Sequence, residues 1–161
     1  MKEFLEDFEE TVKKSVKRLS KLSDQESGIA KTPDKWSAKQ IIGHLIDSAA
    51  NNHQRFVRAQ FGDNLIFPGY DQEKWVKVQR YDLSDWNALI NLWNSYNFHI
   101  IHVVKQIPES DLFKSRSKHN LDQIAWKTVP VSESVTLDYF IRDYVGHLKN
   151  HLDQIWSQYK V

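Results

Sequence analysis

Residues 136–155 read TLDYFIRDYVGHLKNHLDQI, and this stretch decides the fold class. Its apolar residues recur at intervals of three and four, which is the spacing of a helix that buries one face. Thr136 precedes the first apolar residue, where its hydroxyl can accept a hydrogen bond from an amide of the first turn. We expect a helix that starts after Thr136 and buries Leu137, Phe140, Ile141, Tyr144, Leu148, Leu152 and Ile155.

Three earlier segments show the same spacing, over about residues 3–22, 37–61 and 84–107. Ser37 and Gln40 form a capping-box arrangement at the start of the second segment, and Ser84 is the expected N-cap of the third. Four amphipathic helices in 161 residues predict an all-α fold, with residues 1–161 forming one domain. This domain is expected to be a four-helix bundle with long connections, whose helix order and direction stay open.

The connection DNLIFPGYDQEKWVKVQRYD, residues 63–82, is long for a loop. It contains a turn signal at Pro68-Gly69, and a short helix is expected at about residues 71–78. Loops of this length in compact domains are usually functional, so we expect this one to cover the opening of a site. Tyr70 and Asp71 would be able to close over that opening. The later region 108–135 shows little periodicity.

The composition narrows the classes of protein. Hydrophobic residues make up 40% of the chain and charged residues 27%, which is typical of a globular protein. The 22 basic and 21 acidic side chains leave a formal charge of +1, so no global field favours nucleic acid or an anionic membrane as a partner. Neither a signal peptide nor a membrane-length apolar run is visible, which predicts a cytoplasmic location. Because there is no cysteine, any metal must sit on histidine, carboxylate or water.

Three histidines are candidates for one metal site. His147 and His151 lie four residues apart in the last helix, so their imidazoles project from one face, although this spacing also fits a surface pair. His44 stands on another helix inside the apolar stretch 41–46, where an unpaired polar group is unfavourable and where Gly43 permits close approach of a neighbouring backbone. His44 is either a core histidine satisfied by one hydrogen bond or the third ligand. Three histidine ligands leave a position open for water or substrate, as in catalytic zinc sites.

The other four histidines are weaker candidates, expected at the surface or partly buried. His53 lies nine residues after His44, about 13 Å along the helix, which is too far to share an ion. His99 and His102 lie three residues apart beside the apolar stripe of the third helix, and His119 falls in the irregular region.

Two acidic residues stand close to these histidines in sequence. Asp47 follows His44 by three residues and Asp143 precedes His147 by four, so either can orient an imidazole or relay a proton. The alternative is that both are solvated carboxylates on a helix surface.

A polar stripe continues from His44 along its helix through Ser48, Asn51 and Arg55, and it can line a cavity above the metal. Arg55 then either holds an anionic group of a substrate or pairs with a surface acid. The tryptophans are interpreted as core or lid packing, because large aromatic side chains dominate burial. They are Trp36, Trp75, Trp86, Trp93, Trp126 and Trp156.

Three stretches, taken in order, complete a pattern. They are Trp36-Ser37-Ala38 leading into Gly43-His44-Leu45-Ile46-Asp47, then Pro68-Gly69-Tyr70-Asp71-Gln72 with Trp75, and finally Asp143-Tyr144-Val145-Gly146-His147-Leu148-Lys149-Asn150-His151. Over nearly the whole chain this pattern resembles the DinB-like superfamily of helical-bundle metalloproteins, which includes thiol-dependent S-transferases related to YfiT. One early helical histidine followed by a late HxxxH is the metal signature of that family.

The resemblance implies a four-helix bundle that binds a divalent metal through His44, His147 and His151. Nickel or zinc is the expected ion, with manganese and iron as alternatives. Three neutral imidazoles leave the ion its positive charge, so a bound water or thiol would be a nucleophile near neutral pH. The late motif reads HLKNH and lacks a glutamate, which argues against a protease of the HExxH class.

The function expected from these features is that of an intracellular metal-dependent enzyme. It would activate water or a low-molecular-weight thiol and act on a small-molecule substrate, as a thiol S-transferase or a hydrolase, with Asp47, Asp143 and Arg55 as candidate catalytic residues. The alternative is a non-catalytic metal-binding or stress-responsive module, closed by a fourth ligand such as His53, Asp47 or Asp143. A third is a helical scaffold without metal. Homodimerisation through an exposed helix face is compatible with the sequence, which offers no decisive patch.

Overall fold

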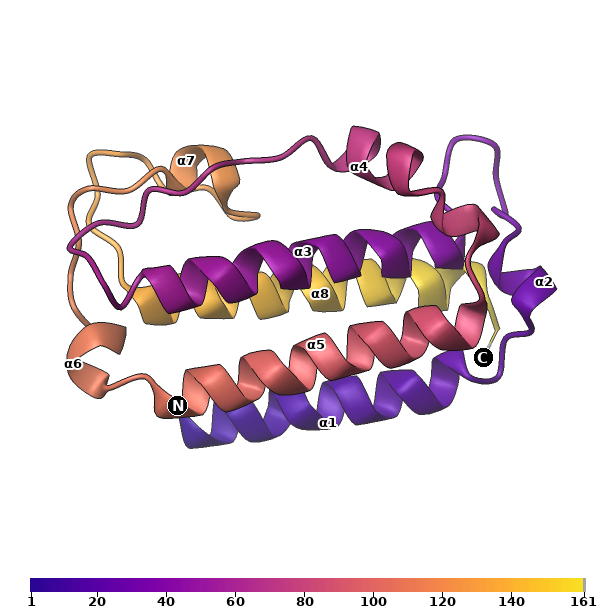
Figure 1. Ribbon diagram of the computed structural model, residues 1–161, viewed down its shortest axis with the longest axis horizontal. Helices are drawn as coiled ribbons and strands as arrows, with labels where there is room; N and C mark the ends of the chain where they lie inside the picture. The colour runs from indigo at the N-terminus through magenta and orange to yellow at the C-terminus, as the bar shows by residue number, and fades with distance from the viewer. Residues whose placement is uncertain (161) are drawn as a thin grey trace.

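Four long helices dominate the computed structural model, which describes residues 1–160 (Figure 1). They are α1 (Lys2–Leu19), α3 (Ala38–Arg58), α5 (Trp86–Gln106) and α8 (Leu137–Gln158). The connections carry short pieces, namely α2 (Asp24–Ser27), α4 (Gln72–Gln79), the 3-10 helix η1 (Tyr81–Leu83), α6 (Glu109–Leu112) and α7 (Leu121–Ile124). Residues 1–160 contain no strand and only two isolated bridges, Leu65 with His119 and Arg116 with Val135. The predicted all-α bundle is therefore confirmed.

The long helices close a ring in cross-section. Helix α3 packs against α5 and α8, and α1 completes the ring by contacting the same two helices. In Figure 1 the chain runs along α1 and α8 in one direction and along α3 and α5 in the other. The neighbours α3 and α5 are thus parallel, and the crossover of residues 59–85 has to return along the outside of α3 to join them. This crossover explains why the second connection is so long.

The helix boundaries follow the expected capping chemistry, with two corrections. Ser37 and Thr136 cap α3 and α8 through their hydroxyls, and Ser37 does so within a complete capping box. Asp85 rather than Ser84 caps α5, because the Asp85 carboxylate accepts a first-turn amide at 2.8 Å. Helix α3 ends three residues before Phe61, which is 83% exposed and therefore lies outside the apolar face assigned to it.

Helix α3 is held on its outer side by an aromatic contact at Gly43. A Cβ atom at Gly43 would lie 2.1 Å from a ring carbon of Tyr81, so only glycine lets this ring pack on the helix. The close approach expected at Gly43 is thus made by a side chain rather than by a backbone. The Tyr81 hydroxyl donates to Asp47 at 2.7 Å, which fixes the ring in place and ties η1 to α3.

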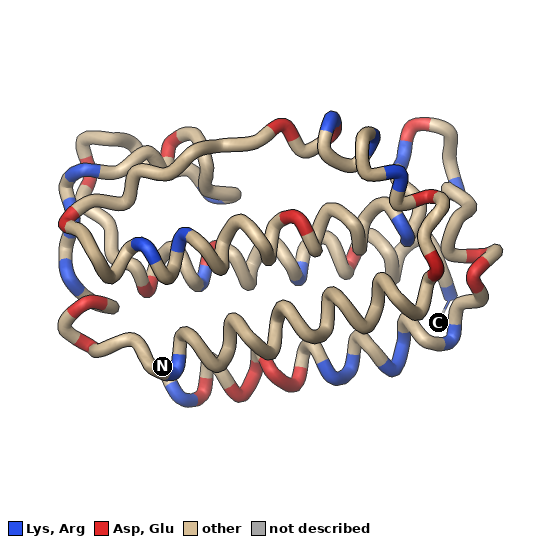
Figure 2. Tube along the Cα trace, in the orientation of Figure 1, with Lys and Arg blue, Asp and Glu red and all other residues tan. Residues whose placement is uncertain are grey.

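After Lys2, the acidic residues of α1 precede its basic residues, and residues of both signs occur along the connections, as Figure 2 shows. Several form pairs one turn apart on a helix, such as Lys13 with Glu9 at 2.6 Å. Pairs of this kind contribute little to stability, because water and salt screen them. Across residues 1–160, no helix combines the length and the apolar character needed to cross a membrane.

Replacing Gly43 by alanine tests the contact that fixes η1. The added methyl group would displace the Tyr81 ring, and the overpacking should outweigh the better helix propensity of alanine. We expect the free energy of unfolding to fall by about 1–2 kcal/mol in urea denaturation. Gly28→Ala is the control, because its nearest neighbours lie 3.7 Å from the added atom. Equal stability of the Gly43→Ala and wild-type proteins would contradict this account.

Candidate metal centre

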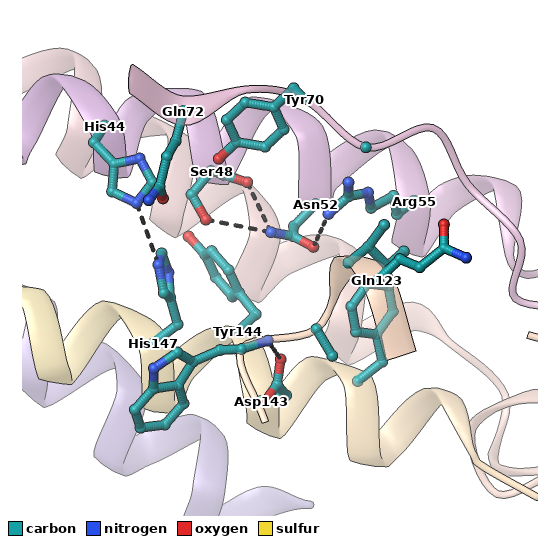
Figure 3. Close-up of a pocket in the computed structure, with 15 residues that line it drawn as sticks. His44, Ser48, Asn52, Arg55, Tyr70, Gln72, Gln123, Asp143, Tyr144 and His147 are labelled. Atoms are coloured by element: carbon teal, nitrogen blue, oxygen red, sulfur yellow. Dashed lines mark hydrogen bonds between the residues drawn. The ribbon is translucent and has the colours of Figure 1, made fainter. Parts of the chain in front are cut away.

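Three imidazoles converge between α3 and α8. His44 comes from α3, and His147 and His151 come from successive turns of α8. One ligand nitrogen from each ring can be chosen so that all three lie within 4.8 Å of one another, and the Nε2 atoms of His44 and His147 are 3.2 Å apart. Figure 3 shows one nitrogen of each of these two rings pointing at the other. In the part of the chain that is described, no other group of three or more histidine or carboxylate side chains comes as close.

The donor set fits a divalent ion. Two nitrogens bound tetrahedrally at about 2.1 Å lie roughly 3.4 Å apart, close to the 3.2 Å separation of His44 and His147. Nδ1 of His151 lies 3.0 Å from the amide oxygen of Gln154, which can only accept, so Nδ1 carries the proton and Nε2 keeps a free lone pair. The buried Nδ1 of His44 has no hydrogen-bond partner within residues 1–160. The one hydrogen-bond contact of His44 is thus to another candidate ligand, the Nε2 atom of His147.

Burial keeps these imidazoles neutral. His44 is 1% exposed, and its removal from water lowers its pKa to about 3, with a further contribution from His147 and His151. Desolvation, followed by the proximity of His151, lowers the pKa of His147 to about 3 as well. Desolvation also lowers the pKa of His151, although the hydrogen bond to Gln154 opposes this shift. Neutral imidazole is the form that binds metal, so the cluster is ready for an ion at neutral pH.

Two tryptophans border the cluster. The ring of Trp36 lies 5.3 Å from that of His44, and the ring of Trp126 lies 6.5 Å from that of His147. Gly146 makes room for the second indole, because a Cβ atom there would lie 2.9 Å from a carbon of Trp126. Trp36 is partly buried and Trp126 is 42% exposed, so both lie beside the histidines as lid residues rather than as core residues.

A cavity of about 340 Å³ lies beside the cluster, with His44 and His147 at one end (Figure 3). The crossover supplies Tyr70 to its lining, as expected of a loop over a site, and burial together with the charge of Asp47 raises the pKa of Tyr70 to about 12. Asp71 takes no part, because it is exposed and caps α4. The cavity therefore has a protonated phenol, rather than a carboxylate, on its crossover side.

Asp47 and Asp143 are buried and bonded within the protein, not solvated at the surface. Asp47 accepts from Tyr81 at 2.7 Å and from Gln79 at 2.8 Å, and it does not line the cavity. Asp143 lines the cavity, but its two oxygens each accept a backbone amide after α7, both at 2.8 Å. Desolvation raises the pKa of both carboxyl groups. Neither bonds to an imidazole of the cluster; Asp47 holds side chains of the crossover, and Asp143 holds the backbone after α7.

The polar side chains of α3 that line the cavity differ at one position from those expected. Ser48 and Arg55 line the cavity, but Asn52 does so in place of Asn51. At about 100° per residue, Ser48, Asn52 and Arg55 all lie to the same side of His44, whereas Asn51 lies to the other side. The pairing of Arg55 with a surface acid is not found, because Arg55 is buried and its hydrogen bonds are to neutral oxygens.

The remaining histidines have other roles. His53 and His99 meet across α3 and α5, with their Nε2 atoms 3.2 Å apart, and form a pair that the sequence had placed on separate helices. His102 is exposed. His119, expected at the surface or partly buried, is 6% exposed and bonds to the Glu133 carbonyl at 2.7 Å. His119 therefore holds the irregular region 108–135 together.

The sequence matches the DinB superfamily over residues 7–155, which is most of the chain. The chain belongs to the DinB superfamily. Two relatives from Oceanobacillus iheyensis are both named "putative metal-dependent hydrolase". The first is 23% identical over 91% of this chain and 82% of its own length. The second is 25% identical over 76% of this chain and 64% of its own length.

Two solved structures resemble this DinB-superfamily protein in fold. YfiT from Bacillus subtilis, described as "a probable metal-dependent hydrolase with an unusual four-helix bundle topology", matches with a TM-score of 0.75 at 16% identity, over 98% of this chain and 87% of that one. A mycothiol-dependent maleylpyruvate isomerase matches with a TM-score of 0.57 at 12% identity, over 94% and 57%. The family and the four-helix bundle expected from the sequence are thus confirmed.

The lowered histidine pKa values predict how the stability of the metal-free protein depends on pH. His44 and His147 titrate near pH 3 when folded and near 6.5 when unfolded, so the unfolded chain binds more protons between these values. The free energy of unfolding should therefore be highest above about pH 6.5 and fall as the pH decreases towards 3. Chemical denaturation of chelator-treated protein measures this dependence. His44→Leu should make the free energy of unfolding depend less steeply on pH, whereas the exposed control His102→Leu should leave this dependence unchanged. If His44→Leu shows the same pH dependence as the wild type, burial does not suppress the protonation of His44.

Proposed function

We propose that this DinB-superfamily protein is a metal-dependent hydrolase that holds one divalent ion on His44, His147 and His151. The observation that carries the proposal is the meeting of three neutral imidazoles from two helices at the end of a cavity. The names of its relatives support the same reaction class. The substrate would be a small molecule, because the cavity of about 340 Å³ lies at the lower end of the usual range for ligand pockets.

Three imidazole donors favour nickel or zinc over the harder ions, with manganese and iron as weaker candidates. When bound, such an ion lowers the pKa of a water or thiol attached to it and so supplies a nucleophile near neutral pH. The chain's own contribution is the neutral state of the imidazoles, the tautomer that Gln154 fixes on His151, and the packing of Trp36 and Trp126 beside the rings.

The cavity lining would position the substrate rather than move its protons. Tyr70 keeps its proton, since its pKa is raised to about 12, and can act as a hydrogen-bond donor. Ser48 and Asn52 add neutral polar groups on the α3 side. Asp143 is the only acid in the lining, and both of its oxygens are bound to backbone amides. A carboxylate base free to act is therefore missing from the residues that line this cavity.

A second candidate reaction is transfer of a low-molecular-weight thiol. The likeness in fold to a mycothiol-dependent isomerase supports it, and the chain has no cysteine, so the thiol would have to enter the cavity as a small molecule. A non-catalytic metal module is less well supported. Within residues 1–160 no fourth histidine or carboxylate joins the three imidazoles, and two of them face a cavity large enough for a ligand.

The metal site is tested by elemental analysis of tag-free protein. We expect about one equivalent of divalent ion in the reference protein and almost none when His44→Ala or His147→Ala is added to it. All samples should carry His99→Ala, because the His53–His99 pair can hold a second, weakly bound ion. His102→Ala is the matched control and should retain the full equivalent. Metal that persists in both site variants, or no binding after reconstitution with nickel, zinc and manganese, would overturn the ligand assignment.

The reaction is tested with metal-loaded protein and a panel of activated small esters and amides, assayed with and without an added thiol. Hydrolysis should proceed without thiol, stop on chelation, return with the ion, and fall at least about tenfold in His147→Ala. If turnover strictly requires the added thiol, the proposed reaction is thiol transfer and not hydrolysis. Turnover that survives chelation would contradict a metal-dependent enzyme of either kind.

A further inference from the structure

Arg55 is a buried cation without an anionic partner. It is 6% exposed, yet its terminal nitrogens donate only to neutral oxygens, the Asn52 side chain at 3.3 Å and the Pro68 carbonyl at 2.8 Å. The ring of Phe140 lies 6.0 Å from its guanidinium carbon. None of the ion pairs found within residues 1–160 includes Arg55. Its charge is therefore taken out of water without a countercharge.

The protein has no internal means of removing this charge. A guanidinium stays protonated at neutral pH even when burial lowers its pKa, as it does for Arg55. Asp143, the acid of the cavity lining, has both oxygens occupied by backbone amides. Asp47 lies outside the lining; its Oδ1 accepts from Tyr81 and Gln79, and its Oδ2 has no hydrogen-bond partner within residues 1–160. An unpaired buried charge is strongly unfavourable, so a countercharge that arrives with a ligand would be bound with corresponding strength.

The position of Arg55 relates it to the histidine cluster. Arg55 follows His44 by eleven residues, which is three turns, so both lie on the cavity side of α3 and about 16 Å apart along its axis. Figure 3 shows Arg55 and Gln123 at one end of the cavity, with His44 and His147 at the other. A helical side chain leans toward the N-terminus of its helix, which directs the guanidinium toward the cavity interior.

The bonds to Asn52 and Pro68 also prepare the guanidinium for binding. They hold both terminal nitrogens but use only two of its five N–H donors, one on each. A planar fork fixed in this way matches an oxyanion with two oxygens, and charge-assisted bonds of this kind are the strong ones. Lysine could supply the charge at this position but not the fork.

We propose that Arg55 is an anion-binding residue, and that the ligand of the cavity carries a carboxylate or phosphate group at the end remote from the histidines. The substrate class is then a small, elongated organic anion whose reacting bond lies near His44 and His147. That this anion is the substrate rests on the proposed function, whereas the anion site itself does not depend on a metal.

The test is calorimetric titration of chelator-treated, full-length protein with glutarate, glycerol 3-phosphate and inorganic phosphate, with glycerol as the uncharged probe. Wild type should bind glutarate or glycerol 3-phosphate, and Arg55→Gln should weaken that binding at least tenfold. Arg55→Lys should lie between the two. Arg58→Gln is the matched control: it removes an exposed arginine of the same helix that does not line this cavity, and binding should be unchanged.

A measurement on the wild type alone guards against a variant that fails to fold. The Nε–H resonance of Arg55 should shift when the organic anion is added and stay fixed with glycerol. Equal binding by wild type and folded Arg55→Gln, no binding of either organic anion, or tighter binding of inorganic phosphate than of both would overturn the inference. Retention of anion binding in metal-free His147→Ala separates this site from the metal proposal, so each can fail without the other.

Discussion

The burial of α3 on almost every side is the constraint on which the rest of the structure depends. The bundle covers one side through α5 and α8, and the crossover 59–85 covers the other, so that 14 of its 21 residues are buried. Polar side chains of α3 must then find their partners inside the protein. Lys39 pairs with Asp24 at 2.8 Å, Asp47 accepts from Tyr81 at 2.7 Å, and Asn52 bonds to Ser48 at 2.9 Å. Each of these bonds fixes a connection or a turn.

Three buried polar residues of α3 do not fully fit this pattern: Oδ2 of Asp47 has no partner within residues 1–160, and His44 and Arg55 are the other two. His44 has one ring nitrogen facing another imidazole and the other without a partner, and Arg55 has only neutral acceptors for its charge. A fold stabilised by burial alone would favour apolar residues at both positions, since buried groups with incomplete partners are destabilising. Both residues line the same cavity. In the proposed function an ion would bind Nε2 of His44, and an anion would give Arg55 its countercharge.

The sequence was sufficient to predict what depends on local spacing. The four helices and the pairing of His147 with His151 follow from periods of three and four along one helix at a time, and the caps at Ser37 and Thr136 follow from residue type. His44 was joined to that pair by its place in an apolar stretch and by the resemblance to the DinB-like superfamily. The partners of Asp47 and Asp143 could not be predicted, because they come from connections that no periodicity places. The pairing of His53 with His99 depends on the parallel arrangement of α3 and α5, which the sequence left open. Asn52 was missed in favour of Asn51, since the side of α3 that faces the cavity is set by tertiary packing.

The helices and the connections supply different groups to the site, and this limits the reactions that the cavity can support. Helices α3 and α8 supply the three histidines, while the crossover and the segment around α7 supply much of the opposite lining, including Tyr70, Gln123 and Trp126. That lining offers no free carboxylate, and its phenol holds its proton at neutral pH. Proton removal from a nucleophile therefore cannot be assigned to a separate base, as it can in an HExxH protease. In the proposed function, the nucleophile would have to be made acidic by the ion held on the histidine cluster. Residues of the connections would then determine which substrate binds, while the histidines would determine how the nucleophile is activated.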